Sequence, residues 1–192
     1  MEIKYFIVGS LLTNCYLLIS KDEAAVIDPG GGAKTIFKEI EKSGAKLKYI
    51  ILTHGHWDHT LSVAKIKEKT GAKILLHEAE KEFVKFKVDE FLKDYNPPTT
   101  LPRPTRAPDS EIKIGDLVLK VIHTPGHTKG SICLSGENFI FTGDTLFKDG
   151  YGRTDLKGGS EEDLKNSLEK LSKILKPGMK VYPGHGEIFE IE

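Results

Sequence analysis

The chain has 192 residues, and its 28 lysines and arginines balance 28 aspartates and glutamates. A neutral chain argues against a nucleic-acid-binding protein and against one that is drawn to an anionic membrane. The length favours a single domain over residues 1–192, with a core large enough to be stable without disulfides.

The N-terminal stretch does not resemble a targeting signal. It lacks a basic segment followed by an apolar one, and no apolar run in the chain reaches about 18 residues. The two cysteines, Cys15 and Cys133, lie in apolar strand-like runs, as expected of buried thiols in a reducing compartment. We therefore expect a cytoplasmic protein with a small-molecule substrate and with neither a nucleic acid nor a membrane as partner.

The first half of the chain predicts an antiparallel β-meander that passes into strand–helix alternation. Apolar runs between short turns predict the strands, and apolar residues three and four positions apart predict the helices. In chain order these are strands over 2–8, 12–20 and 24–27, a helix over Ala33–Ser43, a strand over 47–53, a helix over Thr60–Thr70 and a strand over 73–76. This order is typical of a mixed sheet covered by helices.

Residues 78–110 differ in composition from the chain on either side. A charged helix is predicted over Glu78–Lys93, because its aromatic residues fall roughly on one side. A proline-rich loop over 96–108 follows, which excludes a central strand or a helix. The insertion 78–110 is either a solvated connector or a lid over the substrate pocket.

The second half of the chain predicts further strands and one long helix. Ser160 is the predicted N-cap of that helix, because acidic residues fill the turn after it and leucines follow at helical spacing. The predicted strands cover 112–114, 117–122, 131–135, 138–142 and Lys180–Tyr182.

The most informative stretch follows the buried strand that ends near Thr53. It places His54, His56, Asp58 and His59 within six positions. The side chains of His54 and His56 share one face of an extended strand end and can bind one ion, whereas Asp58 and His59 follow a turn and can bind a second. Imidazole and carboxylate ligands suit zinc, with iron and manganese as alternatives.

Three more ligand candidates occupy the same kind of position. His127, Asp144 and His185 each come just after a predicted strand, in a turn that contains glycine. Strand ends that converge at one edge of a layered fold would bring all these side chains into one cleft. The seven residues suffice for two ions, the first held by His54, His56 and His127, the second by Asp58, His59 and His185, with Asp144 bridging both.

Five stretches together resemble the metallo-β-lactamase superfamily, and within it the glyoxalase II-like hydrolases. They are Ile27–Gly30, Thr53–His59, Thr124–Thr128, Phe141–Phe147 and Pro183–Gly186. The resemblance covers nearly the whole chain, and every ligand position of the family is filled. It implies an α/β fold, a four-layer αββα sandwich of two mixed sheets flanked by helices, with a dinuclear site at one edge. The chain resembles a short form without the C-terminal helical region of full-length glyoxalase II.

The chemistry expected of two divalent ions is hydrolysis by a hydroxide held between them. Asp58 is the predicted catalytic residue, a ligand that also orients this hydroxide. A thiolate, whose thiol has a pKa of about 8.5, can leave without a proton donor, whereas an amide nitrogen cannot. No spare acid stands in the motifs, so thioesters are the predicted substrates.

Several other residues are candidates for supporting roles. Asp28 and Thr53 are expected to support the ligands; Asp28 either accepts a hydrogen bond from a ligand histidine or caps the helix after it. Asn14, Tyr151 and Arg153 are candidates for the substrate pocket, and the resemblance implies that a basic residue near Arg153 meets an acidic end of the substrate. Two further histidines, His77 and His123, are expected to be structural.

Alternative functions exist on the same scaffold. A mononuclear-iron persulfide dioxygenase would use only part of the ligand set, and its second site would stand empty although every ligand for it is present. Hydrolysis of lactones, β-lactams or nucleic acids ranks below both. A purely structural metal site is disfavoured, because closed structural sites use four protein ligands and no bridging carboxylate.

Overall fold

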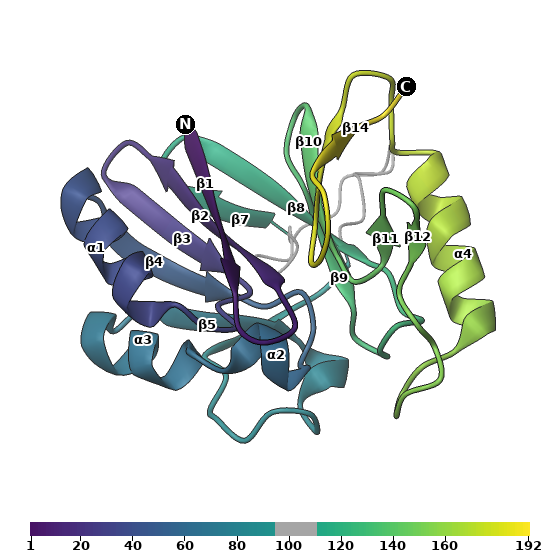
Figure 1. Cartoon of the computed structure of the whole chain (residues 1–192), viewed down its shortest axis with the longest axis horizontal. Helices are drawn as coiled ribbons and strands as arrows, with labels where there is room; N and C mark the ends of the chain where they lie inside the picture. Colours follow the sequence, from purple (N-terminus) through teal and green to yellow (C-terminus); the bar gives the residue numbers. More distant parts are fainter. Residues whose placement is uncertain (95–110) are drawn as a thin grey trace, which may run out of the picture.

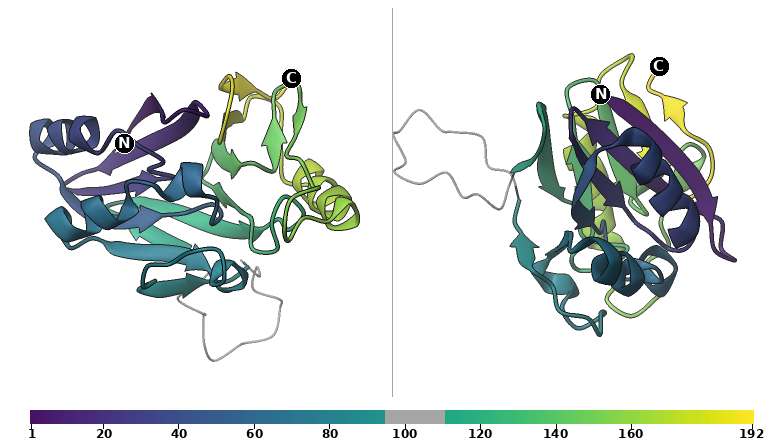
Figure 2. Two further views of the ribbon diagram at one scale, coloured as in Figure 1. Left: turned by 60° about the horizontal axis from the view of Figure 1, so that its bottom comes forward. Right: turned by 90° about the vertical axis from the view of Figure 1, so that its left-hand side faces the viewer.

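The computed structural model describes residues 1–94 and 111–192, so the proline-rich loop predicted over 96–108 lies outside the described residues. Two six-stranded sheets face each other, and helices cover the outer face of each, as Figures 1 and 2 show. The predicted four-layer αββα sandwich of two mixed sheets is confirmed.

The first sheet joins an antiparallel hairpin to parallel strands. Its order is β1-β2-β3-β4-β5-β6, where β3, β4, β5 and β6 run parallel and β1, β2 and β3 antiparallel. The strands are β1 (Glu2–Val8), β2 (Thr13–Ser20), β3 (Glu23–Ile27), β4 (Lys46–Ile51), β5 (Lys73–His77) and β6 (Glu90–Leu92). Its helices are α1 (Ala33–Ser43), the short α2 (Trp57–Thr60) and α3 (Val63–Thr70). The predicted meander is thus confirmed. The helix predicted over Thr60–Thr70 begins at Val63 as α3, and the short helix α2 precedes it.

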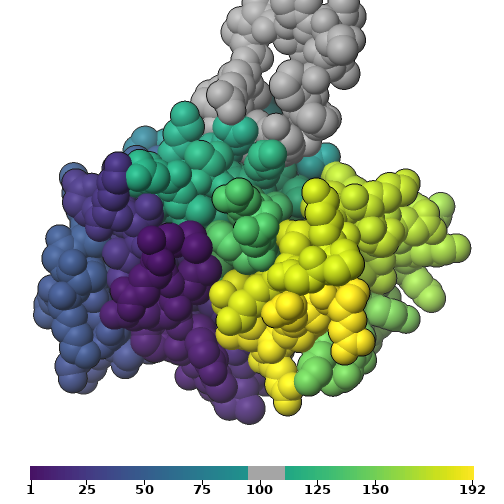
Figure 3. Space-filling view, turned by 90° about the horizontal axis from the view of Figure 1, so that it is seen from above, coloured from purple at the N-terminus to yellow at the C-terminus, as the bar shows by residue number. Residues whose placement is uncertain are grey.

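The second sheet has the order β14-β13-β10-β9-β8-β7, with a parallel pair at β10 and β13. Its strands are β7 (Glu111–Ile114), β8 (Leu117–His123), β9 (Ile132–Ser135), β10 (Phe139–Gly143), β13 (Lys180–Pro183) and β14 (Phe189–Glu190). A separate hairpin joins β11 (Leu146–Phe147) to β12 (Gly150–Tyr151), and helix α4 (Glu161–Ser172) follows. Figure 3 shows the N-terminal segment, in purple, beside the C-terminal segment, in yellow.

Alternating side chains of each strand enter different layers of the core. In β2, Cys15 and Leu17 pack in the layer under α1 and α3, whereas Tyr16 and Leu18 pack between the two sheets. A third layer, with Leu171 of α4, covers the outer face of the second sheet. This period of two is the pattern of a strand that is buried on both faces.

The prediction of a helix over Glu78–Lys93 is wrong. The structure has one 3-10 turn, η1 (Glu78–Glu80), then turns and the parallel strand β6. Val84, Phe86 and Val88 pack against the outer core at alternating positions, a spacing of two that does not fit one face of a helix. The proposed lid over 78–110 remains a prediction, since 95–110 lie outside the described residues.

The metal-ligand candidates exit their strands at the same edge of the sandwich. The parallel strands β3 and β4 end just before Asp28 and Thr53, and the parallel strands β10 and β13 end just before Asp144 and Gly184. Two backbone hydrogen bonds join the sheets at this edge: Ile132 N to Thr53 O (2.9 Å) and Asn14 N to Gly184 O (2.7 Å). Parallel strands therefore carry the candidates to one place.

In the part of the chain that the structure describes, no helix has the length and apolarity to cross a membrane.

Candidate metal centre

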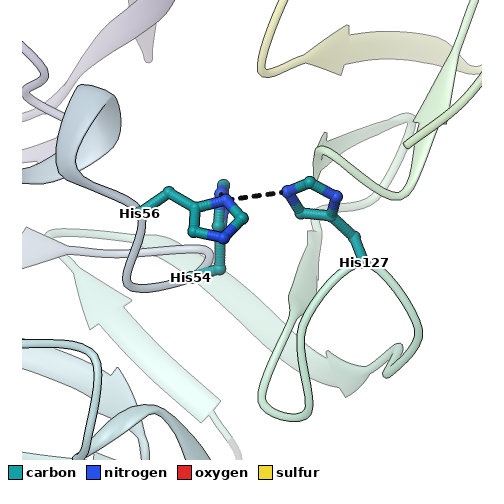
Figure 4. Close-up of side chains that lie close together, drawn as sticks. All are labelled: His54, His56 and His127. Carbon is teal, nitrogen blue, oxygen red and sulfur yellow. Dashed lines mark hydrogen bonds between the residues drawn. The ribbon is translucent and has the colours of Figure 1, made fainter. Parts of the chain in front are cut away.

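Three histidines from two loops meet in the predicted first site. His54 and His56 follow β4 in the first sheet, and His127 follows β8 in the second. His54 Nε2 lies 3.1 Å from His56 Nδ1, which lies 3.0 Å from His127 Nε2. Figure 4 shows the three rings turned toward a common point, with His127 facing the other two.

The predicted second site lies beside the first. Asp58 and His59 lie on α2, and His185 follows β13. The Nε2 atoms of His59 and His185 are 3.2 Å apart, and Asp58 Oδ2 lies 3.4 Å and 3.3 Å from them. These two triads and a third group, His54, His59 and Asp144, are close enough for each to hold a metal ion.

Asp144 lies between the two triads. Its Oδ1 is 3.4 Å from His59 Nε2, and its Oδ2 is 3.5 Å from both His127 Nε2 and His185 Nε2. Among the described residues, this Oδ1 is the buried side-chain oxygen that has no hydrogen-bond partner. A buried carboxylate oxygen without a partner is costly unless a cation binds it.

Backbone carbonyl groups fix the orientation of two ligand rings. His127 Nδ1 donates to the carbonyl of Arg153 (2.8 Å), and His185 Nδ1 donates to the carbonyl of Leu11 (3.0 Å). A carbonyl only accepts, so the neutral form of each ring carries its proton on Nδ1 and its lone pair on Nε2. Both lone pairs therefore point into the site.

Asp28 fixes two further rings. Its Oδ2 accepts from His59 Nδ1 (3.0 Å) and from Thr53 Oγ1 (2.6 Å). Because the hydroxyl of Thr53 donates to Asp28, its oxygen is left to accept from His54 Nδ1 (3.1 Å). Helix α1 has Gly32 as its N-cap and no side-chain cap, so the structure places Asp28 on a ligand histidine rather than on the helix.

The arrangement fits a pair of divalent cations. In their neutral forms these imidazoles present lone pairs to one another at 3.0–3.2 Å. Such contacts gain little without a cation, whereas ligand atoms about 2.0–2.1 Å from one tetrahedral ion lie a little over 3 Å apart. The unpartnered oxygen of Asp144 faces the same point.

Burial and neighbouring charges shift the titration of the cluster. Burial lowers the pKa of His54 well below its usual value, and burial with the charge of His127 lowers the pKa of His56 to about 4. His59 differs: burial opposes its charged form, but Asp144 and Asp28 raise the pKa of His59 to about 9. His54 and His56 are thus preset as neutral ligands, whereas a metal that binds His59 must displace a proton.

The predicted substrate residues lie in different settings. Asn14 is buried, and its amide donates to the carbonyls of Pro183 and Gly186 (both 3.0 Å), which favours a structural role. Tyr151 is 63% exposed beside the site. The guanidinium of Arg153 is exposed and paired with Asp155.

Two side chains that support the ligands or their loops carry no signal in the sequence. Thr13 Oγ1 donates to Asp58 Oδ2 (3.1 Å), and the buried Glu80 binds backbone amides of both ligand loops. Neither residue belongs to a motif, and the helix wrongly predicted over Glu78–Lys93 gave Glu80 no special place. Their positions depend on contacts between distant segments.

Comparison with known proteins agrees with this geometry. A family model described as the metallo-beta-lactamase superfamily matches residues 8–185. The chain belongs to the metallo-beta-lactamase superfamily of metal-dependent hydrolases.

Three similar proteins give a more detailed view. A probable metallo-hydrolase of Methanocaldococcus jannaschii is 38% identical and covers 92% of this chain and 88% of its own length. The hydroxyacylglutathione hydrolase GloC of Haemophilus influenzae is 32% identical, with 97% and 91% covered. The crystal structure of TTHA1623 in a di-iron-bound form superposes with a TM-score of 0.78 at 26% identity, covering 97% of this chain and 94% of that one.

Proposed function

We propose that this protein is a dinuclear metal-dependent thioesterase. The observation that carries the proposal is the convergence of seven ligand side chains, four of whose rings are oriented by hydrogen bonds on their outer nitrogens. The similarity to a hydroxyacylglutathione hydrolase supports a thioester substrate. Two bound ions would supply an acidified water molecule and a polarised carbonyl group.

Asp58 is the carboxylate that we propose orients the attacking water. Burial opposes its ionisation, but the hydrogen bond with His185 and the charge of His59 hold the pKa of Asp58 below its usual value. Thr13 donates to its Oδ2, which fixes the carboxylate in place. An ionised carboxylate accepts a hydrogen bond from the attacking water and orients it, but is a poor proton donor.

Because Asp58 is a poor proton donor, the site favours leaving groups that can depart without a proton. A departing amine needs a proton, whereas a thiolate leaves unaided because its conjugate thiol has a pKa of about 8.5. Thioesters are therefore better substrates for this site than amides or lactams. The proposed role of Asp58 is to orient the nucleophile rather than to protonate the leaving group.

A cavity beside His185 is the proposed place for the substrate. It measures about 340 Å³, and its lining includes Phe147, Lys148 and Tyr151. Tyr151 therefore stays a candidate substrate contact. For Arg153, we propose that its carbonyl positions His127, while its guanidinium is exposed and paired with Asp155.

Zinc is the metal we propose, because five imidazoles and two carboxylates at these separations suit it. The same ligands accept iron and manganese, and TTHA1623 has been crystallised in a di-iron-bound form. The native metal therefore has to be measured together with the activity.

The test is a substrate panel on protein loaded with zinc, iron or manganese. The panel contains hydroxyacyl and simple acyl thioesters of glutathione and coenzyme A, a lactone, a β-lactam and a phosphodiester. We expect two ions per chain and kcat/KM at least 100-fold higher for the best thioester than for the β-lactam. Metal content and thiol release are the measurements.

Two results would contradict the proposal. Two bound ions without thioester hydrolysis would reject the substrate class. One iron per chain, with oxygen uptake on glutathione persulfide, would favour the dioxygenase.

A further inference from the structure

A buried carboxylate outside the ligand set connects the two loops that form the first site. Glu80 has no exposed surface; its Oε2 accepts from Gly55 N and its Oε1 from Gly130 N, both at 2.7 Å. Gly55 lies between His54 and His56, and Gly130 lies three residues after His127 in the same loop.

Both glycines lie in close contact with the Glu80 side chain. A Cβ at Gly55 would lie 2.9 Å from Glu80 Oε2 and 2.7 Å from Phe83 Cβ. A Cβ at Gly130 would lie 2.6 Å from Glu80 Cγ. Any side chain at either position would displace Glu80, so glycine is needed here for close approach rather than for an unusual backbone angle.

His56 is the ligand that depends most on this contact. Within residues 1–94 and 111–192, no group hydrogen-bonds its Nε2, whereas the outer nitrogens of His54 and His127 are held by Thr53 and by a carbonyl. Its ring instead packs edge-on against Phe83, with the centroids 6.1 Å apart. The Phe83 N–H in turn donates to the carbonyl of Glu80 (2.9 Å).

We propose that Glu80 is a positioning residue for the first metal site. Its two oxygens hold the backbones of the His54–His56 loop and the His127 loop at a fixed separation, so that the three lone pairs meet at one point. The second site has its own supports, Asp28 for His59 and Thr13 for Asp58. The inference rests on the proposed metal centre and is independent of the substrate.

The test is Glu80→Gln, which has the same shape but directs an amide NH2 at one of the two backbone N–H groups. The matched control is Glu23→Gln, because Glu23 also accepts a hydrogen bond from a backbone amide, Gly115 N at 2.8 Å. Glu23 lies at the start of β3, at the end of the strand opposite the metal edge. Zinc is titrated against a competing chelator, and the NMR signals of the histidine rings show which site fills.

We expect Glu80→Gln to bind the first ion 10- to 100-fold more weakly, the range seen when a group that orients a metal ligand is lost. Affinity at His59 and His185 should change by less than 3-fold, and the amides of Gly55 and Gly130 should exchange with solvent at least 10-fold faster. Glu23→Gln should leave both affinities unchanged.

Equal weakening at both sites, or no weakening at either, would overturn the role of Glu80. If Glu80→Gln does not fold, the native protein provides the test. The inference requires NMR scalar couplings across the two hydrogen bonds, from the amides of Gly55 and Gly130 to the carboxyl carbon of Glu80. Their absence would reject it. Two tightly bound ions without thioester hydrolysis would overturn the proposed activity and leave this inference standing.

Discussion

At the scale of single residues, the site is a set of candidate ligand atoms brought together before any metal binds. Asp144 shows this most clearly, because its Oδ1 is buried without a partner and its Oδ2 lies 3.5 Å from His127 and His185, one ligand of each triad. Repulsion and desolvation within such a group oppose folding unless cations are bound. The cluster therefore indicates function rather than stability.

Asp144→Ala should lose both ions and reduce hydrolysis to background. The two oxygens that face both triads disappear, while the fold loses no hydrogen bond at Oδ1. Metal content after dialysis, activity and the circular dichroism spectrum are the measurements. The control, Asp116→Ala, removes an exposed carboxylate that pairs with Lys21 and should keep both ions. Two ions retained in Asp144→Ala would refute its bridging position.

At the scale of elements, the ends of β5 and β8 bring two histidines together away from the metal ligands. His77 stacks on His123 with the ring centroids 4.1 Å apart and the planes 11° apart. His77 Nδ1 accepts from Ala79 N, and His123 Nε2 contacts the carbonyl of Lys129. Both rings join segments of the fold, in line with the structural role expected for them.

This stack predicts a loss of stability in acid. Burial, and then the charge of His123, lowers the pKa of His77 to about 4, opposed by the charge of Asp94. The unfolded chain, with a histidine pKa of about 6.5, takes up the proton first as the pH falls. The contribution is therefore full above pH 6.5 and is lost as the pH falls toward 4.

His77→Asn provides the test, because asparagine can still accept from Ala79 N but has no imidazole to titrate. Between pH 7 and 4.5 the metal-free native protein should lose more free energy of unfolding than the variant, by on the order of 1–2 kcal/mol after solvent screening. Denaturant titrations at both pH values measure this difference. Equal losses would show that His77 titrates normally.

At the scale of the whole molecule, the metal centre lies where the two sheets meet. His54, His56, Asp58 and His59 come from the first sheet, and His127, Asp144 and His185 come from the second. Ions held by both sheets bind the folded chain in preference to the unfolded one. Metal binding should therefore stabilise the entire sandwich rather than one loop.

Removing the metal should lower the melting temperature. With free metal at 100 times the dissociation constant, one ion contributes about 2.7 kcal/mol. For a chain of this size, that corresponds to roughly 5–10 °C. Calorimetry before and after chelation, with restoration by zinc, measures the shift. An unchanged melting temperature would mean that no ion links the sheets.

The fold and the ligands were largely predictable because their signals are local. The residues from Thr53 to His59 identify themselves by spacing, and a strand followed by a glycine turn precedes His127, Asp144 and His185. The segment after β5 was misread as a helix because Phe83 and Phe86 stand three positions apart, whereas the side chains that pack on the core, Val84, Phe86 and Val88, alternate. Packing against the outer core decides between the two spacings.

The sequence by itself determined which side chains can bind metal and that their strands end at a common edge. Only the tertiary structure decided how they are held: Leu11 to His185, Thr13 to Asp58, and Glu80 to both ligand loops. The reason is physical. Ligand chemistry and strand periodicity are properties of neighbouring residues, whereas a hydrogen bond such as that between Leu11 and His185, 174 positions apart, exists only once two sheets have packed.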